Sequence, residues 1–177
     1  MKNSTDILNN QDILDLIKKE KLLEGYIDLD TQITPNGFDL TAASIYAFDA
    51  AGAMDFSNKE RVVPAGKEIL SVKKSSDDKF GWWDLRPGAY KVKTNEIVNI
   101  PCDLIALAYP RSTLLRIGGF TQNAVWDAGF KGKSEFILIV NNPFGIKIKQ
   151  NARVIQLIFV RVKHTGKGYD GIYQNHK

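Results

Sequence analysis

The sequence predicts a mainly β fold, a sandwich or barrel, preceded by one short helix. Over most of its length, short segments of β-branched and aromatic residues are separated by the turn residues Gly, Pro, Asn and Asp. The first 25 residues instead show the apolar spacing that is typical of a helix. A chain of 177 residues can bury a substantial core in one domain. We therefore expect a single domain over residues 1–177.

The helix is expected in the N-terminal segment 1–25. Asn9 or Asn10 can cap it, and it should run for about three turns and end before Gly25. Its apolar face would be formed by Ile13, Leu14 and Ile17.

The strands follow the helix. We expect them at 39–48, 68–73, 90–93, 96–100, 104–109, 135–140, 145–149 and 153–162. The last of these is continuously apolar over residues 154–160 apart from Gln156, which predicts a strand buried on both faces. The segment 164–177 is rich in Gly, His and Lys, and we expect a flexible tail there.

Charge and composition exclude several classes of protein. The net charge of +4 comes from 24 basic and 20 acidic residues with no basic block, so we expect no nucleic-acid partner, although a small polyanionic ligand would suit it. No apolar run approaches the roughly 20 residues of a membrane span, and the N-terminal residues do not resemble a signal peptide. With a single cysteine, Cys102, the chain is expected to be cytoplasmic.

One segment has the features of an anion site. Arg111 directly follows the apolar strand 104–109, and Ser112 or Thr113 can cap a short helix that Gly118 would end. Unpaired helix amides, a hydroxyl and two arginines, Arg111 and Arg116, would together attract an anion. An ordinary capped helix with a solvated arginine fits the same pattern.

Three further polar residues could carry chemistry. Asp127 lies between a tryptophan and a Gly-rich turn, where a carboxylate can act as a general base towards water or simply cap the turn. Asp39 follows a similar glycine turn. The amide of Gln156 must find either a backbone partner or a ligand within its apolar strand. No Walker loop, dinucleotide-binding glycine motif or zinc spacing is present.

In order along the chain, these segments resemble the motifs of the dUTPase and dCTP deaminase superfamily. Residues 7–13 and 21–23 are similar to the N-terminal helix of dCTP deaminases. The other matching segments are 33–40, Arg86-Pro87-Gly88, Thr94-Asn95-Glu96, 100–106, Pro110-Arg111-Ser112-Thr113-Leu114, Asp127-Ala128-Gly129-Phe130-Lys131-Gly132 and 152–157. The resemblance covers most of the chain.

The resemblance implies a distorted jelly-roll barrel that assembles as a homotrimer, with active sites between subunits. The ligand would be dUTP or a related pyrimidine deoxynucleotide. The cofactor would be Mg2+, held mainly by the substrate phosphates and through water by Asp39. Asp127 would be the catalytic base. The expected substrate-binding residues are Asp39, Arg111, Ser112, Thr113, Arg116 and Gln156 near the phosphates, Gln122, Asn123 and Val125 at the pyrimidine, and Phe130 under the deoxyribose. Tyr169 and Gln174 of the tail would close over the bound nucleotide.

The choice of reaction depends on one position. The deaminases of this superfamily carry a catalytic glutamate about ten residues after the aspartate, where this chain has Ile137. We therefore expect a dUTP diphosphatase, in which water attacks the α-phosphate with the help of Mg2+ and releases dUMP and pyrophosphate. Glu135 lies two residues earlier and on the same side of a strand, so a dCTP deaminase remains an alternative. A non-catalytic nucleotide-binding regulator is another. Gly129 also departs from the family, because many dUTPases carry a second acid there.

Overall fold

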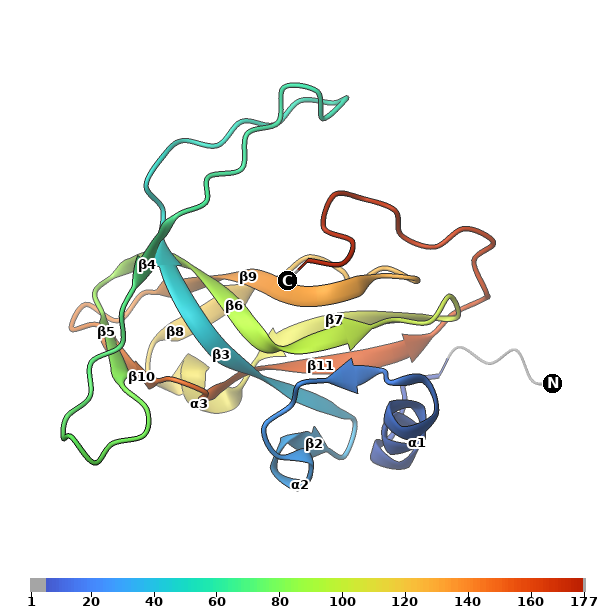
Figure 1. The fold of residues 1–177 in the computed structure, drawn as a ribbon, viewed down its shortest axis with the longest axis horizontal. Coiled ribbons are helices and arrows are strands. Elements are labelled where there is room, and N and C mark those ends of the chain that lie inside the picture. The colour runs from blue at the N-terminus through green and yellow to red at the C-terminus, as the bar shows by residue number, and fades with distance from the viewer. Residues whose placement is uncertain (1–5, 177) are drawn as a thin grey trace.

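The computed structural model describes residues 6–176 and shows one large, strongly coiled sheet with short helices along its lower side in the view of Figure 1. Residues 1–5 and 177, which the single-domain prediction includes, lie outside the described residues. The helices are α1 (Asn10–Glu20), α2 (Leu29–Gln32) and α3 (Ser112–Arg116). The strands are β1 (Leu23–Glu24), β2 (Ile33–Thr34), β3 (Gly37–Ala47), β4 (Lys67–Ile69), β5 (Trp82–Leu85), β6 (Gly88–Asn99), β7 (Leu104–Pro110), β8 (Gly119–Gln122), β9 (Lys131–Val140), β10 (Ile146–Lys149) and β11 (Arg153–Arg161).

The sheet closes almost into a barrel. Its main order is β7-β11-β3-β6-β9-β8, with antiparallel pairing throughout, and β1, β2 and β4 attach at its sides. The two ends of this order meet where Ala106 of β7 and Trp126, just after β8, exchange two backbone hydrogen bonds of 3.0 Å. The separate pair β5 and β10 forms a small second sheet. The predicted fold class, a mainly β distorted barrel with a short N-terminal helix, is confirmed.

Helix α1 begins as the sequence predicts. The Asn9 side chain accepts a hydrogen bond from the backbone of Asp12, whose own side chain bonds back to Asn9 in a capping box. The helix ends at Lys21, which adopts a left-handed conformation. Ile13 and Ile17 are buried against the barrel, so this face of α1 joins the main core.

The core lies between the inward faces of the sheet. In β11, Ile155, Leu157 and Phe159 are fully buried, whereas Gln156, Ile158 and Val160 on the opposite face are only half-buried. The prediction that this strand is buried on both faces is therefore wrong for the single chain. Two of its outward residues, Ile158 and Val160, are apolar although no layer of this chain fully covers them.

The segments expected as strands 90–93 and 96–100 form one strand, β6. Its pairing with β9 shifts register between Lys93 and Ile97, so the polar residues that suggested a break mark a bulge. Glu96 lies at this bulge and is fully buried, where it accepts hydrogen bonds from Gln32 Nε2 (2.7 Å) and from the backbone N and hydroxyl of Thr41 (3.0 and 2.6 Å). Burial raises the pKa of the Glu96 carboxyl above its ordinary value. The network holds α2, which the sequence did not predict, against β3.

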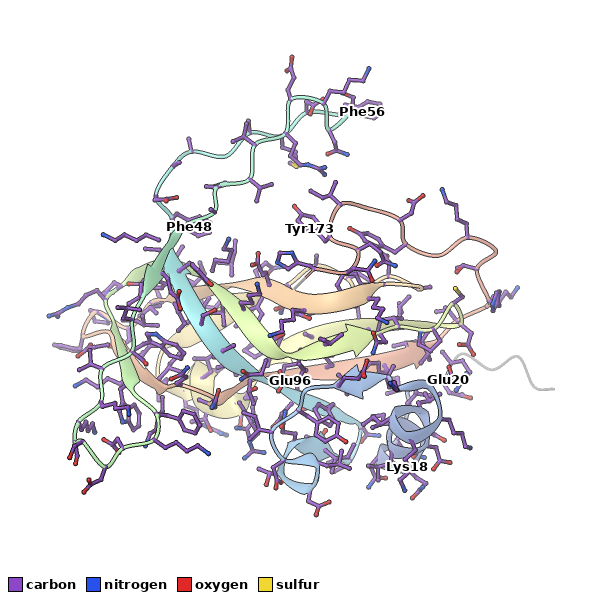
Figure 2. All side chains as sticks on the ribbon, in the orientation of Figure 1. Lys18, Glu20, Phe48, Phe56, Glu96 and Tyr173 are labelled. Atoms are coloured by element: carbon purple, nitrogen blue, oxygen red, sulfur yellow. The ribbon has the colours of Figure 1, made fainter. Side chains whose placement is uncertain are left out.

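Several other elements were also missed. Strands β5 and β8 are short and have polar or glycine-rich neighbours. Of the expected strand 68–73, only Glu68 and Ile69 pair in the sheet, as part of β4. Between β3 and β4, residues 48–66 form an arm that projects from the barrel, with Phe48 at its base and Phe56 fully exposed near its tip (Figure 2). Among the residues that the structure describes, no helix is long and apolar enough to cross a membrane.

Candidate active site

A cluster of two arginines surrounds the carboxylate of Asp39. Asp39 is buried on β3, and its Oδ2 atom lies 2.8 Å from Arg111 Nε and 3.2 Å from Arg153 Nη1. Burial raises the pKa of Asp39, and the two guanidinium groups oppose that rise. The second oxygen, Oδ1, is buried without a hydrogen-bond partner among the described residues. The arginines are only one-third exposed, so they form a positive surface with fixed orientation.

The short helix α3 begins beside this cluster. Arg111 is its N-cap residue and makes no side-chain cap hydrogen bond, so the prediction that Ser112 or Thr113 caps the helix is wrong. Arg111 takes this position because its backbone N bonds to Val154 of β11. The hydroxyls of Ser112 and Thr113 are exposed at the first turn, and Arg116 is exposed at the last. Gly118 ends the helix with a φ of +84°, as predicted.

Gln156 lies near the same cluster on β11, opposite Asp39 of β3. Its Nε2 atom donates to the hydroxyl of Thr34 at 2.9 Å, which is neither the backbone partner nor the ligand considered from the sequence. A Cβ atom at Gly37 would lie 2.9 Å from this Nε2 atom. Gly37 therefore leaves the space that the Gln156 side chain occupies.

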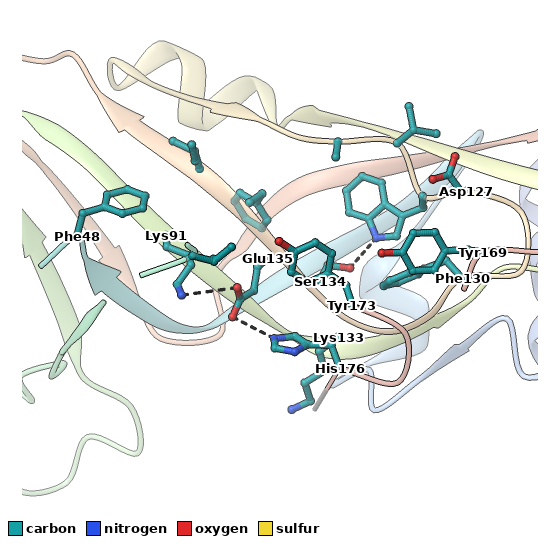
Figure 3. Close-up of a pocket in the computed structure, with 16 residues that line it drawn as sticks. Phe48, Lys91, Asp127, Phe130, Lys133, Ser134, Glu135, Tyr169, Tyr173 and His176 are labelled. Carbon is teal, nitrogen blue, oxygen red and sulfur yellow. Dashed lines mark hydrogen bonds and ion pairs between the residues drawn. The ribbon is translucent and has the colours of Figure 1, made fainter. Parts of the chain in front are cut away.

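Asp127 lines a different region, a cavity of about 540 Å³ (Figure 3). The aspartate is exposed at its edge, and its backbone carbonyl accepts from Phe130 N at 3.0 Å in a tight turn. The neighbouring Trp126 is fixed by a 2.8 Å hydrogen bond from its Nε1 atom to the hydroxyl of Ser134. Val125 lines the cavity as well. A carboxylate held at the mouth of a largely apolar cavity can accept a proton from water.

The tail residues 164–176 lie along this cavity. Tyr169 packs edge-on against Phe130, with ring centroids 5.6 Å apart, and both rings line the cavity. A Cβ atom at Gly129 would lie 2.7 Å from Gly168 Cα, and Gly129 has a φ of +84°. Gly129, where many dUTPases have an acid, is therefore a crossing point for the tail with no room for a side chain.

The remaining predicted binding residues lie outside the cavity lining. Gln122 is exposed at the end of β8, and Asn123 Nδ2 donates to Ala108 O at 3.2 Å. The side chain of Gln174 bonds to the backbone of Gly129 and Lys131, both at 2.9 Å. Its amide groups thus hold the tail to the barrel.

The structure separates the predicted residues into two groups. Asp39, Arg111, Ser112 and Gln156 lie at the end of β7, whereas Asp127, Phe130 and Tyr169 lie around Trp126. Trp126 pairs with Ala106. Pro110 lies four residues further along β7 than Ala106, roughly 13 Å away, and Arg111 follows Pro110. Because the bridge to Trp126 is antiparallel, Asp127 continues away from Arg111. One chain therefore does not bring the two groups together.

Residues 7–162 match the family model described as dCTP deaminase-like. The chain belongs to this family. It is 47% identical over 171 residues to the probable deoxyuridine 5'-triphosphate nucleotidohydrolase of Methanosarcina mazei, covering 96% of each chain. The corresponding protein of Methanocaldococcus jannaschii, a deoxyuridine 5'-triphosphate nucleotidohydrolase, is 37% identical over 82% of this chain and 88% of its own. A crystal structure of the dCTP deaminase from Agrobacterium tumefaciens shares the fold, with a TM-score of 0.63 and 24% identity over 89% of this chain and 48% of that one.

Within this dCTP deaminase-like fold, β9 presents Lys133, Glu135 and Ile137 to the cavity. Ile137, where the resemblance leads us to expect the glutamate of a deaminase, is 38% exposed. Glu135 faces the same cavity, as the two-residue spacing predicts.

Sequence reasoning missed several polar residues of the site. Arg153 immediately follows Ala152 in a matching motif, but nothing in that pattern indicated that its side chain would reach Asp39. Lys91 and His176 reach the cavity from β6 and from the tail. Their contacts depend on the closed barrel and the path of the tail, for which the sequence offers no periodic signal.

Proposed function

We propose that this protein is a dUTP diphosphatase that converts dUTP and water to dUMP and pyrophosphate. The observation that carries the proposal is the composition of the cavity: Asp127 stands at its mouth, and Ile137 stands where a deaminase would have its glutamate. The archaeal relatives named as deoxyuridine triphosphate nucleotidohydrolases, which match nearly the full chain, support the same reaction. A cytoplasmic location fits the single free cysteine.

In the proposed reaction, the nucleoside lies in the cavity beside Phe130 and the backbone near Val125. The carboxylate of Asp127 takes a proton from the attacking water as the bond to the α-phosphorus forms. Arg111, Ser112 and Gln156 bind the phosphate oxygens, and Arg153 adds a second fixed guanidinium group. The leaving group is pyrophosphate.

The expected cofactor, Mg2+, fits this site only as a partner of the substrate. Residues 6–176 contain no group of three or more His, Cys, Asp or Glu side chains that could hold a metal. Asp39 Oδ2 is engaged by two arginines, which leaves Oδ1 as the oxygen that could accept from a metal-bound water. When bound through the triphosphate, Mg2+ would neutralise phosphate charge.

A homotrimer would unite the two groups of residues. The arginine cluster of one copy would meet the Asp127 cavity of another, since the two are well separated in one chain. The half-buried apolar face of β11, with Ile158 and Val160, supports such a contact because exposed apolar area favours association.

The test is a turnover assay on dUTP and dCTP that separates dUMP, dUTP and dCMP. We expect dUMP from dUTP in the presence of Mg2+, loss of activity with excess chelator, and no product from dCTP. Conversion of dCTP to dUTP or dUMP would support the alternative, a deaminase that uses Glu135, which faces the cavity. Binding of either nucleotide without turnover would indicate the non-catalytic regulator.

A further inference from the structure

Glu135 lies where three separate parts of the chain meet, and the proposed reaction gives it no task. Its Oε1 atom is 3.2 Å from His176 Nε2 in the tail, and its Oε2 atom is 3.7 Å from Lys91 Nζ on β6 (Figure 3). We propose that Glu135 is a positioning residue that holds the C-terminal tail closed over the nucleoside cavity and connects it to the base of the arm. This inference rests on the proposed function only for its kinetic consequence.

The tail is seated on the first residues of β9 by a series of backbone contacts. Lys133 N donates to His176 O at 2.9 Å, and Asn175 N donates to Lys131 O at 2.7 Å. A Cβ atom at Gly132 would lie 2.9 Å from His176 N, so a glycine is needed for the two backbones to approach this closely. The contact between Glu135 and His176 lies next to these backbone contacts, at their C-terminal end on β9.

Lys91 connects Glu135 to the arm. Its Nζ atom donates to the carbonyl of Ala65 at 2.6 Å and lies 5.3 Å from the ring centroid of Tyr46. Its side chain is only 16% exposed, so the ammonium group has few alternative positions. Ala65 is at the C-terminal end of the arm, whose base contributes Phe48 and Val63 to the cavity.

The tail and the arm also meet directly. Tyr173 lines the main cavity and, together with residues 52–54 and 61–64 of the arm, a second smaller one. The two elements therefore form opposite walls of the opening, and Glu135 lies on the strand between them. One carboxylate with both oxygens engaged can set the position of both walls.

The same contacts distinguish this role from that of a deaminase base. A base must present a carboxylate oxygen to the substrate or to water. The two oxygens of Glu135 instead face groups of the protein itself, the His176 imidazole and the Lys91 ammonium, and Ile137 occupies the deaminase position. Glu135 is thus suited to hold protein segments.

The expected consequence is a change in how often the tail is closed. If only the closed form binds nucleotide tightly, the apparent affinity falls with the fraction of closed molecules. Once the tail has closed on the substrate, the reacting groups are unchanged. Loss of the Glu135 contacts should therefore raise KM more than it lowers kcat.

The test compares Glu135→Gln with a matched control, Asp84→Asn. Asp84 forms an exposed ion pair with Lys147 at 3.4 Å on the β5 and β10 sheet and does not line the cavity. For Glu135→Gln we expect KM for dUTP to rise about three- to tenfold with kcat within about twofold of the parent. Trypsin cleavage after the exposed Lys167, measured without nucleotide, should become at least about threefold faster. The control should match the parent in both measurements.

A second variant, His176→Gln, tests whether the two residues act together. If they do, the double variant should show the same KM and cleavage rate as Glu135→Gln alone, because that variant already lacks the contact to His176. The proposal would be overturned if the effects of the two single variants multiplied in the double variant, or if Glu135→Gln had the KM and cleavage rate of the parent. It would also be overturned if the parent deaminated dCTP and Glu135→Gln abolished that activity. A protein that does not hydrolyse dUTP would refute the proposed function, while the cleavage rate would still decide the role of Glu135.

Discussion

Single residues decide the chemistry of this site through their surroundings. Asp39 and Asp127 were equivalent in the sequence, since each is an acid beside a glycine turn. In the structure Asp39 is buried between two guanidinium groups, whereas Asp127 is exposed at the mouth of a cavity. Of the two, Asp127 is the one placed to take a proton from solvent water, because the carboxylate of Asp39 is buried and one of its oxygens is paired with two arginines.

The base role of Asp127 leads to the first prediction. Asp127→Asn keeps the shape of the side chain but cannot accept the proton, so turnover of dUTP should fall by about 10²- to 10⁴-fold while nucleotide binding is retained. Steady-state kinetics and calorimetric titration with dUTP measure the two quantities. A variant with near-parental turnover would remove Asp127 from this role.

A second prediction concerns the buried carboxyl of Glu96. Its raised pKa means that the folded protein holds a proton that the unfolded chain has released, so its contribution to stability is lost as pH rises above the ordinary value of 4.5. Glu96→Gln replaces the single O–H of the protonated carboxyl by the two N–H donors of an amide, which face the donors Gln32 Nε2 and Thr41 N, and should lower the free energy of unfolding by about 1–3 kcal/mol. The difference should shrink from pH 4.5 upward. Denaturation at several pH values tests this; a constant or growing difference would contradict it.

At the scale of elements, the sequence predicts the features that arise from local periodicity and capping. Helix α1 has its capping box and apolar face in consecutive residues, and the longer strands have clear apolar patterns. The bulge in β6 was mistaken for a break because Thr94, Asn95 and Glu96 are polar. Asn95 and Glu96 both bond to Thr41, which is more than 50 residues away in the sequence. Helix α2 has one local signal, the Asp28 side chain that caps Thr31 N, but its four residues are held in place by the distant contact from Gln32 to Glu96.

The tail is the element with the most direct test. Ending the chain after Gly168 removes Tyr169, Gln174 and His176, and with them the closed form of the cavity. We expect turnover to fall by at least about tenfold, equivalent to ~1.4 kcal/mol, because water is no longer excluded from the bound substrate. The melting temperature should change little, since none of these residues belongs to the buried core and only Tyr169 packs against it. A truncated protein with the full-length rate would show that the tail is not a lid.

At the scale of the whole molecule, the sequence predicts a set of site residues but not how the fold divides them. The motifs follow one another along the chain, and their order in the sequence does not give the distances between them in the folded protein. The closed barrel fixes Trp126 at one point of β7 and Arg111 at another, and this places the two groups of residues apart. The division is therefore a property of the sheet closure, and it points to an assembly in which one copy completes the site of the next.

The proposed assembly leads to a prediction about which copies supply the two halves of each site, and a mass measurement alone could not test it. Light scattering should give three times 19.8 kDa. Asp127→Asn and Arg111→Ala should each be nearly inactive, because each lacks one half of every site. If the halves come from different copies, mixed trimers formed by co-expression of equal amounts should regain activity at about a quarter of their sites, where an intact Arg111 meets an intact Asp127. If both halves come from one chain, no mixture can restore activity, because every chain carries one defect. The active site would lie between subunits if the co-expressed mixture recovers activity and if separately purified trimers, combined without exchange of subunits, do not.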